Sequence, residues 1–278
     1  MSEVYEKRLL RVLDYIHANP GADLSLDALA DVAAMSRYHW HRVFAAMTGE
    51  TLAEATRRVR LHRAACWLVQ TDWPLAEVAR KVGYTNQQSF TRIFREGYGT
   101  TPGAFRNRGE LRPLLLRKDK GEYPMFPVEI TTMEPRTLAA ERHKGPYLEV
   151  GAAFERVSTV FTSRDAWKHA TGMMGLYYDD PKAVPEAELQ SHAGVVVGDA
   201  AHVPEGLDTV EVAGGRVAVM HHKGPYAGLK AAYDYLYGEW LPASGEEPRD
   251  APAMEVYLNN PMDTAPDELL TDVCLPLK

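Results

Sequence analysis

Two internal repeats of different length divide this 278-residue sequence into two halves. In the first half, the segment Trp40–Phe44 recurs at an offset of 50 as Phe90–Phe94, with an arginine at the same position of each copy. In the second half, the pentapeptide His143–Tyr147 recurs unchanged at an offset of 79 as His222–Tyr226. A repeated segment indicates a structural unit that is used twice. The sequence therefore predicts two domains, each built from a pair of similar units.

The later copy in the first half lies in an amphipathic stretch, Tyr84–Phe94. Read as a helix, this stretch places Phe90, Ile93 and Phe94 on one side at the spacing i, i+3, i+4. The other side carries two amides, a hydroxyl and two guanidinium groups, from Gln87, Gln88, Thr91, Arg92 and Arg95. In the DNA major groove, amides can pair with adenine and guanidinium groups with guanine. A solvated helix face has a similar composition, so this stretch alone leaves both interpretations open.

Each copy follows a shorter helical pattern, which gives a helix-turn-helix layout. Pro74 begins the helix before the later copy, and Gly83 ends it. For the earlier copy, Ser25 is a suitable N-cap for a helix over residues 26–34, and Ser36 for the helix that follows. The outer side of that following helix carries Arg37, Tyr38, His41 and Arg42. An arginine at the same outer position of both copies favours DNA recognition over an all-helical bundle with basic faces.

A continuous helix over residues 52–71 is expected between the two units. Twenty helical residues span about 30 Å, and successive major-groove faces on one side of B-DNA lie ~34 Å apart. A single chain can then occupy two adjacent grooves without dimerising. The arginines of this helix are either phosphate contacts or solvated side chains; they are Arg57, Arg58, Arg60 and Arg63.

Residues 5–108 resemble the DNA-binding domain of the AraC/XylS family of transcription activators. The resemblance rests on one pattern, which consists of Gly83-Tyr84, Gln87-Gln88-Ser89-Phe90-Thr91-Arg92-Ile93-Phe94, Tyr98-Gly99, Pro102 and Phe105-Arg106. It implies base contacts from Tyr38, His41 and Arg42 in the first reading helix, the second helix of its unit. In the second reading helix it implies contacts from Gln87, Gln88 and Arg92, beside which Thr91 lies on the same face. Tyr38 and His41 stand where close relatives often have Trp and Gln.

The charge of the chain is distributed unevenly. The net charge is −7, yet residues 1–112 carry 16 Lys+Arg against 12 Asp+Glu, and residues 113–278 carry 15 against 26. A balance of +4 followed by −11 indicates a basic nucleic-acid module joined to an acidic module. The polar stretch Leu111–Tyr123 separates them. We therefore expect a DNA-binding domain over residues 1–110, a linker over 111–124 and a second domain over 125–278.

The second half predicts an α+β domain of two strand–helix–strand–strand repeats. A strand-like run precedes each pentapeptide; these runs are residues 128–142, broken at Glu134-Pro135-Arg136, and residues 208–222, broken at Gly214-Gly215. A helix follows each pentapeptide, over residues 148–161 and 229–241. Two strands then complete each repeat, over residues 171–178 and 193–197, and over 253–258 and 270–275. A groove between the two repeats is the expected ligand site.

Residues 127–278 resemble the GyrI-like ligand-binding domain of multidrug-responsive regulators. The resemblance rests on the paired pentapeptides, Tyr177-Tyr178-Asp179-Asp180-Pro181 and Ala253-Met254-Glu255-Val256-Tyr257. In a strand, Ala253, Glu255 and Tyr257 share one face, while Met254, Val256 and Leu258 share the other and are expected to pack on the helices. A carboxylate among aromatic rings favours a lipophilic cation, and the resemblance implies the same role for Glu255; a solvated strand-edge glutamate is the alternative. The candidate walls of the site, each of which is equally suited to the core, are Tyr147, Tyr177, Tyr226, Trp167 and Trp240.

Several other functions are not indicated by the sequence. His221 and His222 are adjacent strand residues that point to opposite faces, so they cannot chelate a metal together, and no Cys/His spacing suggests zinc. Cys66 and Cys274 are expected to be reduced thiols of a cytoplasmic protein, with Cys66 in the core. No apolar run approaches the ~18 residues of a membrane span, and the first residues lack a basic-then-apolar leader. No cofactor and no membrane partner are expected.

The sequence thus predicts a transcription regulator that is not an enzyme. It would bind double-stranded DNA through two helix-turn-helix units and a small molecule through the acidic domain, and the small molecule would alter DNA binding or contact with RNA polymerase. An alternative comes from stand-alone GyrI-like proteins that resemble hydrolases of strained, cyclopropane-bearing compounds. In that case Glu255 would act as a general base. The covalent link to a DNA-binding module favours sensing.

Overall fold

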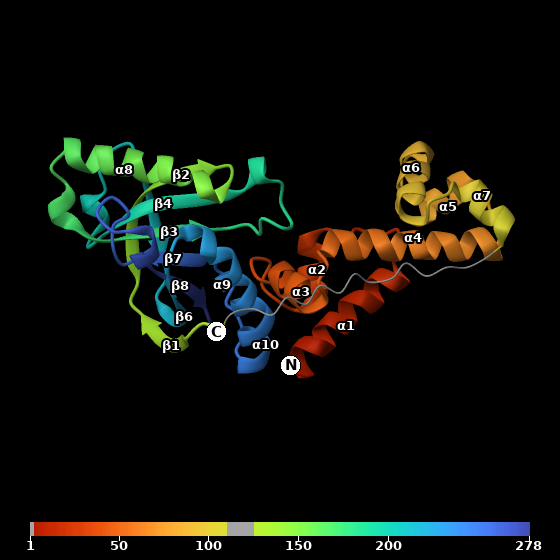
Figure 1. The fold of residues 1–278 in the computed structure, drawn as a ribbon, viewed down its shortest axis with the longest axis horizontal. Helices are drawn as coiled ribbons and strands as arrows, with labels where there is room; N and C mark the ends of the chain where they lie inside the picture. Colours follow the sequence, from red (N-terminus) through yellow and green to blue (C-terminus); the bar gives the residue numbers. More distant parts are fainter. Residues whose placement is uncertain (1–2, 110–124) are drawn as a thin grey trace. The chain divides into compact units, whose positions relative to one another are not determined.

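The computed structural model describes residues 3–109 and 125–278. The chain divides into two compact units, Met1–Lys120 and Gly121–Lys278 (Figure 1). The predicted linker over residues 111–124 lies outside the described residues. The expected domain limits, 1–110 and 125–278, therefore stay predictions.

The described part of the first unit consists of helices, as predicted. Their bounds are α1 Glu3–Ala18, α2 Leu26–Ala33, α3 Trp40–Thr48, α4 Leu52–Gln70, α5 Leu75–Lys81, α6 Gln87–Tyr98 and α7 Pro102–Arg108. Figure 1 shows α4 as the long helix of this unit, with α2 and α3 near one end and α5 to α7 near the other. The fold thus contains two successive helix-turn-helix units, α2–α3 and α5–α6, joined by α4.

Two hydrophobic cores lie along α4, one for each helix-turn-helix unit. The first contains Leu52, Ala55 and Val59 of α4, packed with buried residues of α1, α2 and α3. The second contains Leu61, Ala64, Ala65 and Leu68 of α4, packed with residues of α5, α6 and α7. Because the change from one core to the other falls between positions 59 and 61, α4 belongs to both units.

Side-chain caps fix where these helices begin. The Ser25 side chain accepts a hydrogen bond from the Ala28 amide at the start of α2, as predicted. Thr101 accepts one from the Ala104 amide at the start of α7. Thr51 and Glu54 form a reciprocal capping box at the start of α4. Each cap satisfies backbone N–H groups that the first helical turn leaves without an intrahelical partner.

The second unit is an α+β domain built on one antiparallel sheet of eight strands, β1 Val128–Met133, β2 Arg136–Lys144, β3 Ala170–Tyr177, β4 Gln190–Val197, β5 Asp208–Val212, β6 Gly215–Lys223, β7 Ala253–Tyr257 and β8 Leu270–Pro276. Its α-helices are α8 Gly151–Ser163, α9 Leu229–Tyr235 and α10 Leu241–Ser244, with a π-helical turn η6, Leu236–Trp240, between α9 and α10. Its short 3-10 helices are η1 Tyr147–Glu149, η2 Trp167–His169, η3 Glu186–Glu188, η4 Ala200–His202, η5 Tyr226–Gly228 and η7 Pro266–Glu268.

The strand order β1-β6-β8-β7-β3-β4-β2-β5 reveals the pseudo-twofold symmetry that the repeat predicts. Exchanging β1 to β4 with β5 to β8 reproduces the same order in reverse, so the axis passes between β3 and β7. The expected broken strands are in fact separate strands. The break at Glu134-Pro135 lets β1 pair with β6 of the second repeat while β2 stays in the first, and β5 crosses back to pair with β2.

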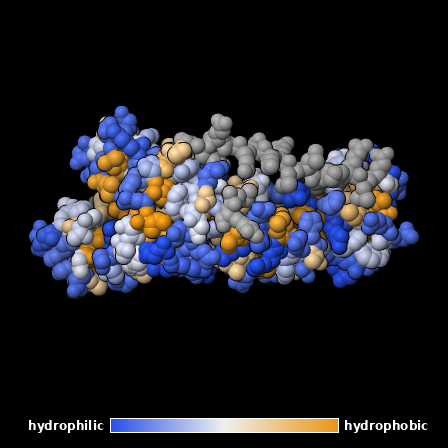
Figure 2. Space-filling view, turned by 90° about the horizontal axis from the view of Figure 1, so that it is seen from below, coloured by the Kyte–Doolittle hydropathy of each residue, from blue (hydrophilic) through white to orange (hydrophobic). Residues whose placement is uncertain are grey.

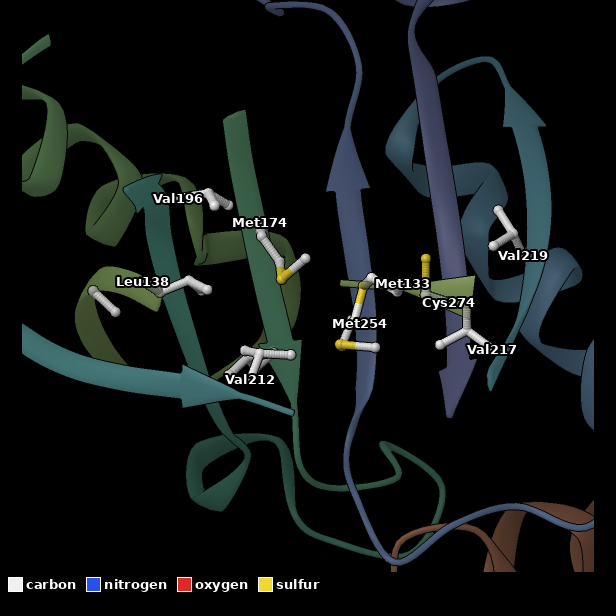
Figure 3. Close-up of a cluster of buried hydrophobic side chains, with 11 residues drawn as sticks. Met133, Leu138, Met174, Val196, Val212, Val217, Val219, Met254 and Cys274 are labelled. Carbon is white, nitrogen blue, oxygen red and sulfur yellow. The ribbon is translucent and has the colours of Figure 1, made fainter. Parts of the chain in front are cut away.

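The two faces of the sheet differ in what covers them. One face carries a cluster of buried side chains contributed by strands of both repeats, among them Leu138, Met174, Met254 and Cys274 (Figure 3). On the other face, Val157 and Phe161 of α8 pack against residues of β2 and β4 such as Val195. Met254 and Val256 belong to the strand-only cluster, so the expectation that they pack on the helices is wrong.

The surface shown in Figure 2 is mainly hydrophilic, with hydrophobic side chains in separate groups. Among the described residues, no helix combines the length and the apolar character that a membrane crossing requires.

Candidate functional site

The helix α6 presents the polar face that the sequence predicts. Phe90 and Phe94 are fully buried. On the other side of the helix Thr91 is partly exposed, and the side chains of Gln87, Gln88, Arg92 and Arg95 are exposed. Asn86 caps the helix, because its side-chain oxygen accepts hydrogen bonds from the amides of Gln88 (2.7 Å) and Ser89 (3.4 Å). This cap was not predicted, although an asparagine just before an amphipathic stretch is a typical signal.

Ion pairs hold the arginine that is central to this face. Arg92 Nη1 lies 2.9 Å from Glu96 Oε1, one helical turn further on, and Arg57 of α4 lies 3.7 Å from the other oxygen of the same carboxylate. Arg92 is 68% exposed at its side chain, so this pair contributes little to stability. Its effect is to orient the guanidinium group while leaving it accessible to a ligand such as a base edge or a phosphate.

The first helix-turn-helix unit departs from the prediction at the start of its second helix. The helix α3 begins at Trp40, four residues after the expected cap Ser36. The Ser36 hydroxyl oxygen instead accepts a hydrogen bond from the Tyr38 amide (3.3 Å) within a turn. Tyr38 therefore lies in the turn before the helix, and not on the helix itself.

His41 and Arg42, which we expected on an outer face of this helix, are buried at 6% and 9% exposure. The six successive residues Trp40–Ala45 of α3 are all buried. The His41 ring turns back along the chain, and its Nδ1 donates to the carbonyl oxygen of Arg37 (3.1 Å). The contacts of His41 and Arg42 with bases stay a prediction.

The arginines of α4 have partners inside the unit, although Arg57 and Arg63 are also exposed to solvent; whether any of them contacts phosphate stays a prediction. Arg58 Nε donates to Glu50 (3.0 Å), and Arg60 Nε and Nη2 donate to the carbonyl oxygens of Pro20 (2.7 Å) and Ala22 (3.2 Å). Arg63 lies over the ring of Trp67, 5.5 Å from its centroid. Arg57 makes the ion pair with Glu96 described above and remains exposed.

The length of α4 matches the predicted two-groove arrangement. Its 19 residues span about 28 Å at ~1.5 Å per residue, somewhat less than the ~34 Å between successive major grooves. A connecting helix of this length is consistent with one reading helix at each of two adjacent grooves.

In the second unit, Glu255 lies in the middle of β7, the strand of the second repeat that pairs with β3 of the first repeat at the centre of the sheet. Its backbone pairs with Gly175 of β3 and Val273 of β8. Because side chains alternate along a strand, Glu255 and Tyr257 point to one face of the sheet and Met254 to the other. The face with Glu255 and Tyr257 is the one that the helices cover. The predicted shared face of Glu255 and Tyr257 is therefore correct, but the helices lie on that same side.

Two tyrosine hydroxyls donate to the buried Glu255 carboxylate, which is 5% exposed. Tyr233 of α9 donates to Oε1 (3.0 Å), and Tyr257 donates to Oε2 (2.8 Å). The hydroxyl oxygens of Tyr257 and Tyr177 are 2.6 Å apart. Since Tyr257 uses its proton for Glu255, Tyr177 donates to Tyr257, and the three side chains form one directed chain of hydrogen bonds that ends on the carboxylate.

Aromatic rings surround this chain of hydrogen bonds. Phe154 of α8 and Tyr226 both meet the ring of Tyr257 edge to face, with centroids 5.3 and 5.6 Å away. Tyr147 meets Tyr177 in the same way at 4.8 Å. We call Glu255 together with its six aromatic neighbours the central cluster; the six are Tyr147, Phe154, Tyr177, Tyr226, Tyr233 and Tyr257.

The central cluster follows the internal repeat. Tyr177 and Tyr257 are equivalent at an offset of 80, and so are Gly175 and Glu255, which face each other across the pseudo-twofold axis. A Cβ atom on Gly175 would lie 2.8 Å from the ring of Tyr177, so the glycine leaves room for that ring. The symmetry is broken at this pair, since one repeat contributes a carboxylate where the other contributes no side chain.

Phe154 and Tyr233 were missed by the sequence analysis. Each comes seven residues after the tyrosine of its pentapeptide, Tyr147 or Tyr226, at equivalent positions in the two repeats. An aromatic residue at the same place of both copies is the signal that would have identified them. They reach the cluster from α8 and α9, which cover the sheet on the Glu255 side.

The two pentapeptides form the same turn and deliver one tyrosine each. His143 Nε2 donates to the carbonyl oxygen of Pro146 (3.2 Å), and His222 Nε2 donates to that of Pro225 (3.3 Å). The glycines between them, Gly145 and Gly224, have φ of 137° and 132°, which disfavours a residue with a side chain. Each turn leads directly into the 3-10 helix that begins with Tyr147 or Tyr226.

The hydroxyl groups of these two tyrosines differ in their partners. Tyr147 Oη accepts from the Asp179 amide (2.9 Å) and lies 3.0 Å from the carbonyl oxygens of Asp179 and Gln190, to one of which it donates. Tyr226 makes no hydrogen bond to any residue that the structure describes. Tyr226 is thus the cluster tyrosine best able to donate to a bound molecule.

Burial sets the protonation state of the cluster tyrosines. It raises the pKa of Tyr257 and of Tyr177 well above the ordinary value, and the negative charge of Glu255 raises both further. The pKa of Tyr226 is raised by the same two causes. All three phenols are therefore protonated at neutral pH and serve as hydrogen-bond donors.

Two candidate walls lie outside the central cluster. Trp167 packs on Phe161 at 5.3 Å, donates its indole N–H to Thr162 (2.9 Å) and is 40% exposed. Trp240, the last residue of η6, has no ring contact or hydrogen bond with the cluster among the described residues. Trp167 and Trp240 were proposed as walls of the site from residue type alone, and residue type does not determine where in the domain a side chain lies.

Neither the histidines nor the cysteines of the described chain form a metal site. No group of three or more His, Cys, Asp or Glu is suitably placed within residues 3–109 and 125–278. The exposed His221 pairs with Asp272 (2.7 Å), whereas the buried His222 bonds to Pro225, so the two rings do point apart. Burial raises the pKa of the Cys274 thiol to about 12. Cys66 is half-buried, and not fully in the core as expected.

Residues 126–278 match the family described as GyrI-like small molecule binding domain, and residues 29–108 match a helix-turn-helix domain family. The chain belongs to the GyrI-like family and carries an AraC-type helix-turn-helix domain. This GyrI-like protein is similar to the bifunctional transcriptional activator/DNA repair enzyme AdaA of Bacillus subtilis, with 36% identity over 36% of the chain and 47% of that relative. It is also similar to the regulatory protein SoxS of Salmonella typhimurium, with 31% identity over 37% of the chain and 97% of that relative.

Both of these matches fall on about a third of the chain, and the chain spans less than half of the length of AdaA. Among solved structures, an EcmrR–DNA complex shares 16% identity over 55% of this chain and 57% of that one, with a TM-score of 0.46.

Proposed function

We propose that this protein is a DNA-binding transcription regulator whose GyrI-like domain senses a small lipophilic cation. The observation that carries the ligand class is the position of Glu255, a buried carboxylate within a ring of aromatic side chains on the pseudo-twofold axis. Aromatic faces attract cations through their negative quadrupole, and a carboxylate adds direct charge attraction. The same surroundings repel anions and gain little from neutral polar groups.

The DNA-binding half of the proposal is supported by the exposed polar face of α6. Gln87, Gln88 and Arg92 carry the donor and acceptor groups that bind base edges in the major groove. For the first helix-turn-helix unit, we propose base contacts from Tyr38, His41 and Arg42. Effector binding would change either DNA affinity or contact with RNA polymerase, which we include among the partners.

A hydrolytic role for Glu255 is less well supported than sensing. A general base must accept a proton from its substrate or from water. Two hydroxyl groups already donate to the Glu255 carboxylate, one to each oxygen, so a substrate or water proton would have to compete with them. The family comparisons give the hydrolase alternative no support.

The ligand class is tested with a matched pair of molecules that differ only in charge. Phenyltrimethylammonium and its neutral carbon isostere tert-butylbenzene have the same shape. Attraction between unit charges ~4 Å apart is about 4 kcal/mol at an effective dielectric of 20, and desolvation of Glu255 offsets much of it. We therefore expect the cation to bind about ten- to a hundredfold more tightly in calorimetric titration.

Variants of Glu255 separate a counter-ion from a structural residue. Glu255→Gln removes the charge and should abolish the preference for the cation, whereas Glu255→Asp keeps the charge and should retain most of it. The exposed Glu155 of α8 provides a control, since Glu155→Gln changes the same charge away from the cluster. Equal losses for both ligands in Glu255→Gln would contradict the counter-ion role, and a cleavage product found by mass spectrometry would favour the hydrolase.

A further inference from the structure

Arg60 occupies the boundary between the two helix-turn-helix units. It stands on α4 between Val59, which belongs to the first hydrophobic core, and Leu61, which belongs to the second. Its side chain is partly buried and reaches the loop after α1. A single helix can bend and twist, so α4 alone does not fix how the two helix-turn-helix units are rotated relative to each other.

The guanidinium group of Arg60 attaches the first helix-turn-helix unit to this boundary. Nε donates to the carbonyl oxygen of Pro20 (2.7 Å) and Nη2 to that of Ala22 (3.2 Å), both in the loop between α1 and α2. Hydrogen bonds from a charged donor are stronger than those between neutral groups. The two bonds connect residues 38 and 40 positions apart in the chain.

The turn of the second helix-turn-helix unit, between α5 and α6, closes over the same side chain. Gly83, between α5 and α6, has φ of 83°, and a Cβ atom there would lie 2.8 Å from Arg60 Cζ. Gly21, in the loop before the first helix-turn-helix unit, lies close to the same turn. A Cβ atom on Gly21 would be 2.8 Å from the carbonyl oxygen of Lys81. We call this contact, formed by Gly21, Arg60, Lys81 and Gly83, the inter-unit junction.

We propose that Arg60 is a positioning residue, which through the inter-unit junction fixes the spacing and rotation at which the two reading helices meet DNA. The inference rests on the proposed DNA binding by both helix-turn-helix units. Inserting one base pair between two half-sites moves one of them by about 3.4 Å and rotates it by about 35°. A rigid junction penalises such an insertion, whereas a loosened junction tolerates it.

The test compares the full-length wild type with Arg60→Met and Gly21→Ala. Arg60→Met keeps a long apolar side chain and removes both hydrogen bonds. Gly21→Ala leaves every charge in place and forces the loop away from the Lys81 carbonyl, so any shared effect cannot come from a lost phosphate contact. Arg63→Met, three positions along the same helix, removes an exposed arginine that stacks on Trp67 and serves as the control.

The DNA set consists of the best duplex selected by the wild type, the same duplex with one base pair added or removed between the half-sites, and one with the first half-site scrambled. The wild type should bind the selected spacing at least about tenfold more tightly than either altered spacing. In Arg60→Met and Gly21→Ala, that ratio should fall to about two- or threefold, because a loosened junction lets the two reading helices adjust to a displaced half-site. Binding to the duplex with one intact half-site should stay within about twofold, and Arg63→Met should keep the wild-type ratio.

Three results would overturn the inference. The first is an equal loss on all spacings, which would make Arg60 a residue of general stability or a phosphate contact. The second is an unchanged ratio in both variants, and the third is a wild type that binds all spacings equally. If the wild type selected no DNA sequence at all, the proposed function itself would fail, which is a distinguishable outcome.

Discussion

At the scale of single residues, the central cluster shows how two copies of one peptide acquire different roles. Tyr147 and Tyr226 are preceded by the same four residues and by the same turn. Tyr147 is fixed by hydrogen bonds to the chain after β3, whereas Tyr226 turns its ring edge toward Tyr257 and keeps its hydroxyl available. One repeat thus supplies a rigid wall and the other a donor beside Glu255.

This difference predicts unequal effects of the same substitution on stability. Tyr147→Phe removes a hydroxyl that accepts one hydrogen bond and donates another, so we expect the free energy of unfolding to fall by about 1–2 kcal/mol. Tyr226→Phe removes a hydroxyl without a partner among the described residues, so the change should stay within about 0.5 kcal/mol. Urea unfolding of the two variants, followed by circular dichroism, measures both values. Equal losses would show that Tyr226 has a structural partner.

The sequence predicts part of this cluster and not the rest, for a physical reason. Strand alternation places Glu255 and Tyr257 on one face whatever the surroundings, so this relation was predicted correctly. Alternation does not say which layer covers that face, and the helices were assigned to the wrong side. Tyr233 reaches Glu255 only because α9 crosses the sheet above it, which is a tertiary relation that local pattern does not contain.

At the scale of elements, the end of α6 is held by a group of stacked rings. Tyr98 lies parallel to Phe94 with centroids 4.7 Å apart and meets Phe105 of α7 edge to face at 4.9 Å. Its hydroxyl is buried and has no hydrogen-bond partner among the described residues. The ring therefore stabilises the contact between α6 and α7, while the hydroxyl group opposes it through its unpaired burial.

Tyr98→Phe should keep the ring contacts and remove this cost. We expect the free energy of unfolding at neutral pH to be unchanged or higher by about 1 kcal/mol. Burial raises the pKa of Tyr98 to about 12, with a smaller contribution from Cys66. Between about pH 10 and 12 the unfolded chain loses a proton that the fold retains, so stability falls as pH rises. The variant should show a shallower decline in that range, and lower stability at neutral pH would contradict the account.

Helix and strand limits were predictable where a local signal sets them. Ser25 caps its helix as expected, because the bond from a side-chain oxygen to a free amide nearby in the chain is a local interaction. The start of α3 was misplaced, since Ser36 bonds within a turn and leaves the helix to begin at Trp40. Strand exchange between the repeats was not predictable either. The break at Glu134-Pro135 indicates an interruption, but not that β1 pairs with the other repeat.

At the scale of the whole molecule, the uneven charge has to be read together with the structure. Residues 1–112 have a balance of only +4, and several of their arginines are committed to partners within the unit. Arg58 is paired with Glu50, and Arg60 and Arg106 donate to backbone carbonyl oxygens. The cations that remain accessible for phosphate contacts are fewer than the sequence suggests, so the salt dependence of DNA binding should be modest for a basic module.

Three arginine-to-alanine variants test which cations meet DNA. Arg95 is exposed on α6 and makes no ion pair with a described residue, so Arg95→Ala should weaken binding to all sequences alike. It should also lower the slope of log affinity against log salt by about 0.9, the value for one phosphate. Arg92→Ala should instead cost ~1–3 kcal/mol on the preferred sequence and relax one base preference, with little change of slope.

Arg58→Ala is the matched control, because its guanidinium group is already neutralised by Glu50 and half-buried. It should leave the salt slope unchanged even if it lowers the stability of the first unit, which thermal unfolding measures separately. Filter binding or fluorescence anisotropy over a range of potassium chloride concentrations gives all three slopes. If Arg58→Ala lowered the slope as much as Arg95→Ala, Arg58 would have to leave Glu50 for a phosphate when DNA binds, and the ion pair would be a feature of the free protein only. If Arg92→Ala weakened all sequences equally, Arg92 would be a phosphate contact, and the base contacts of α6 would have to come from Gln87 and Gln88.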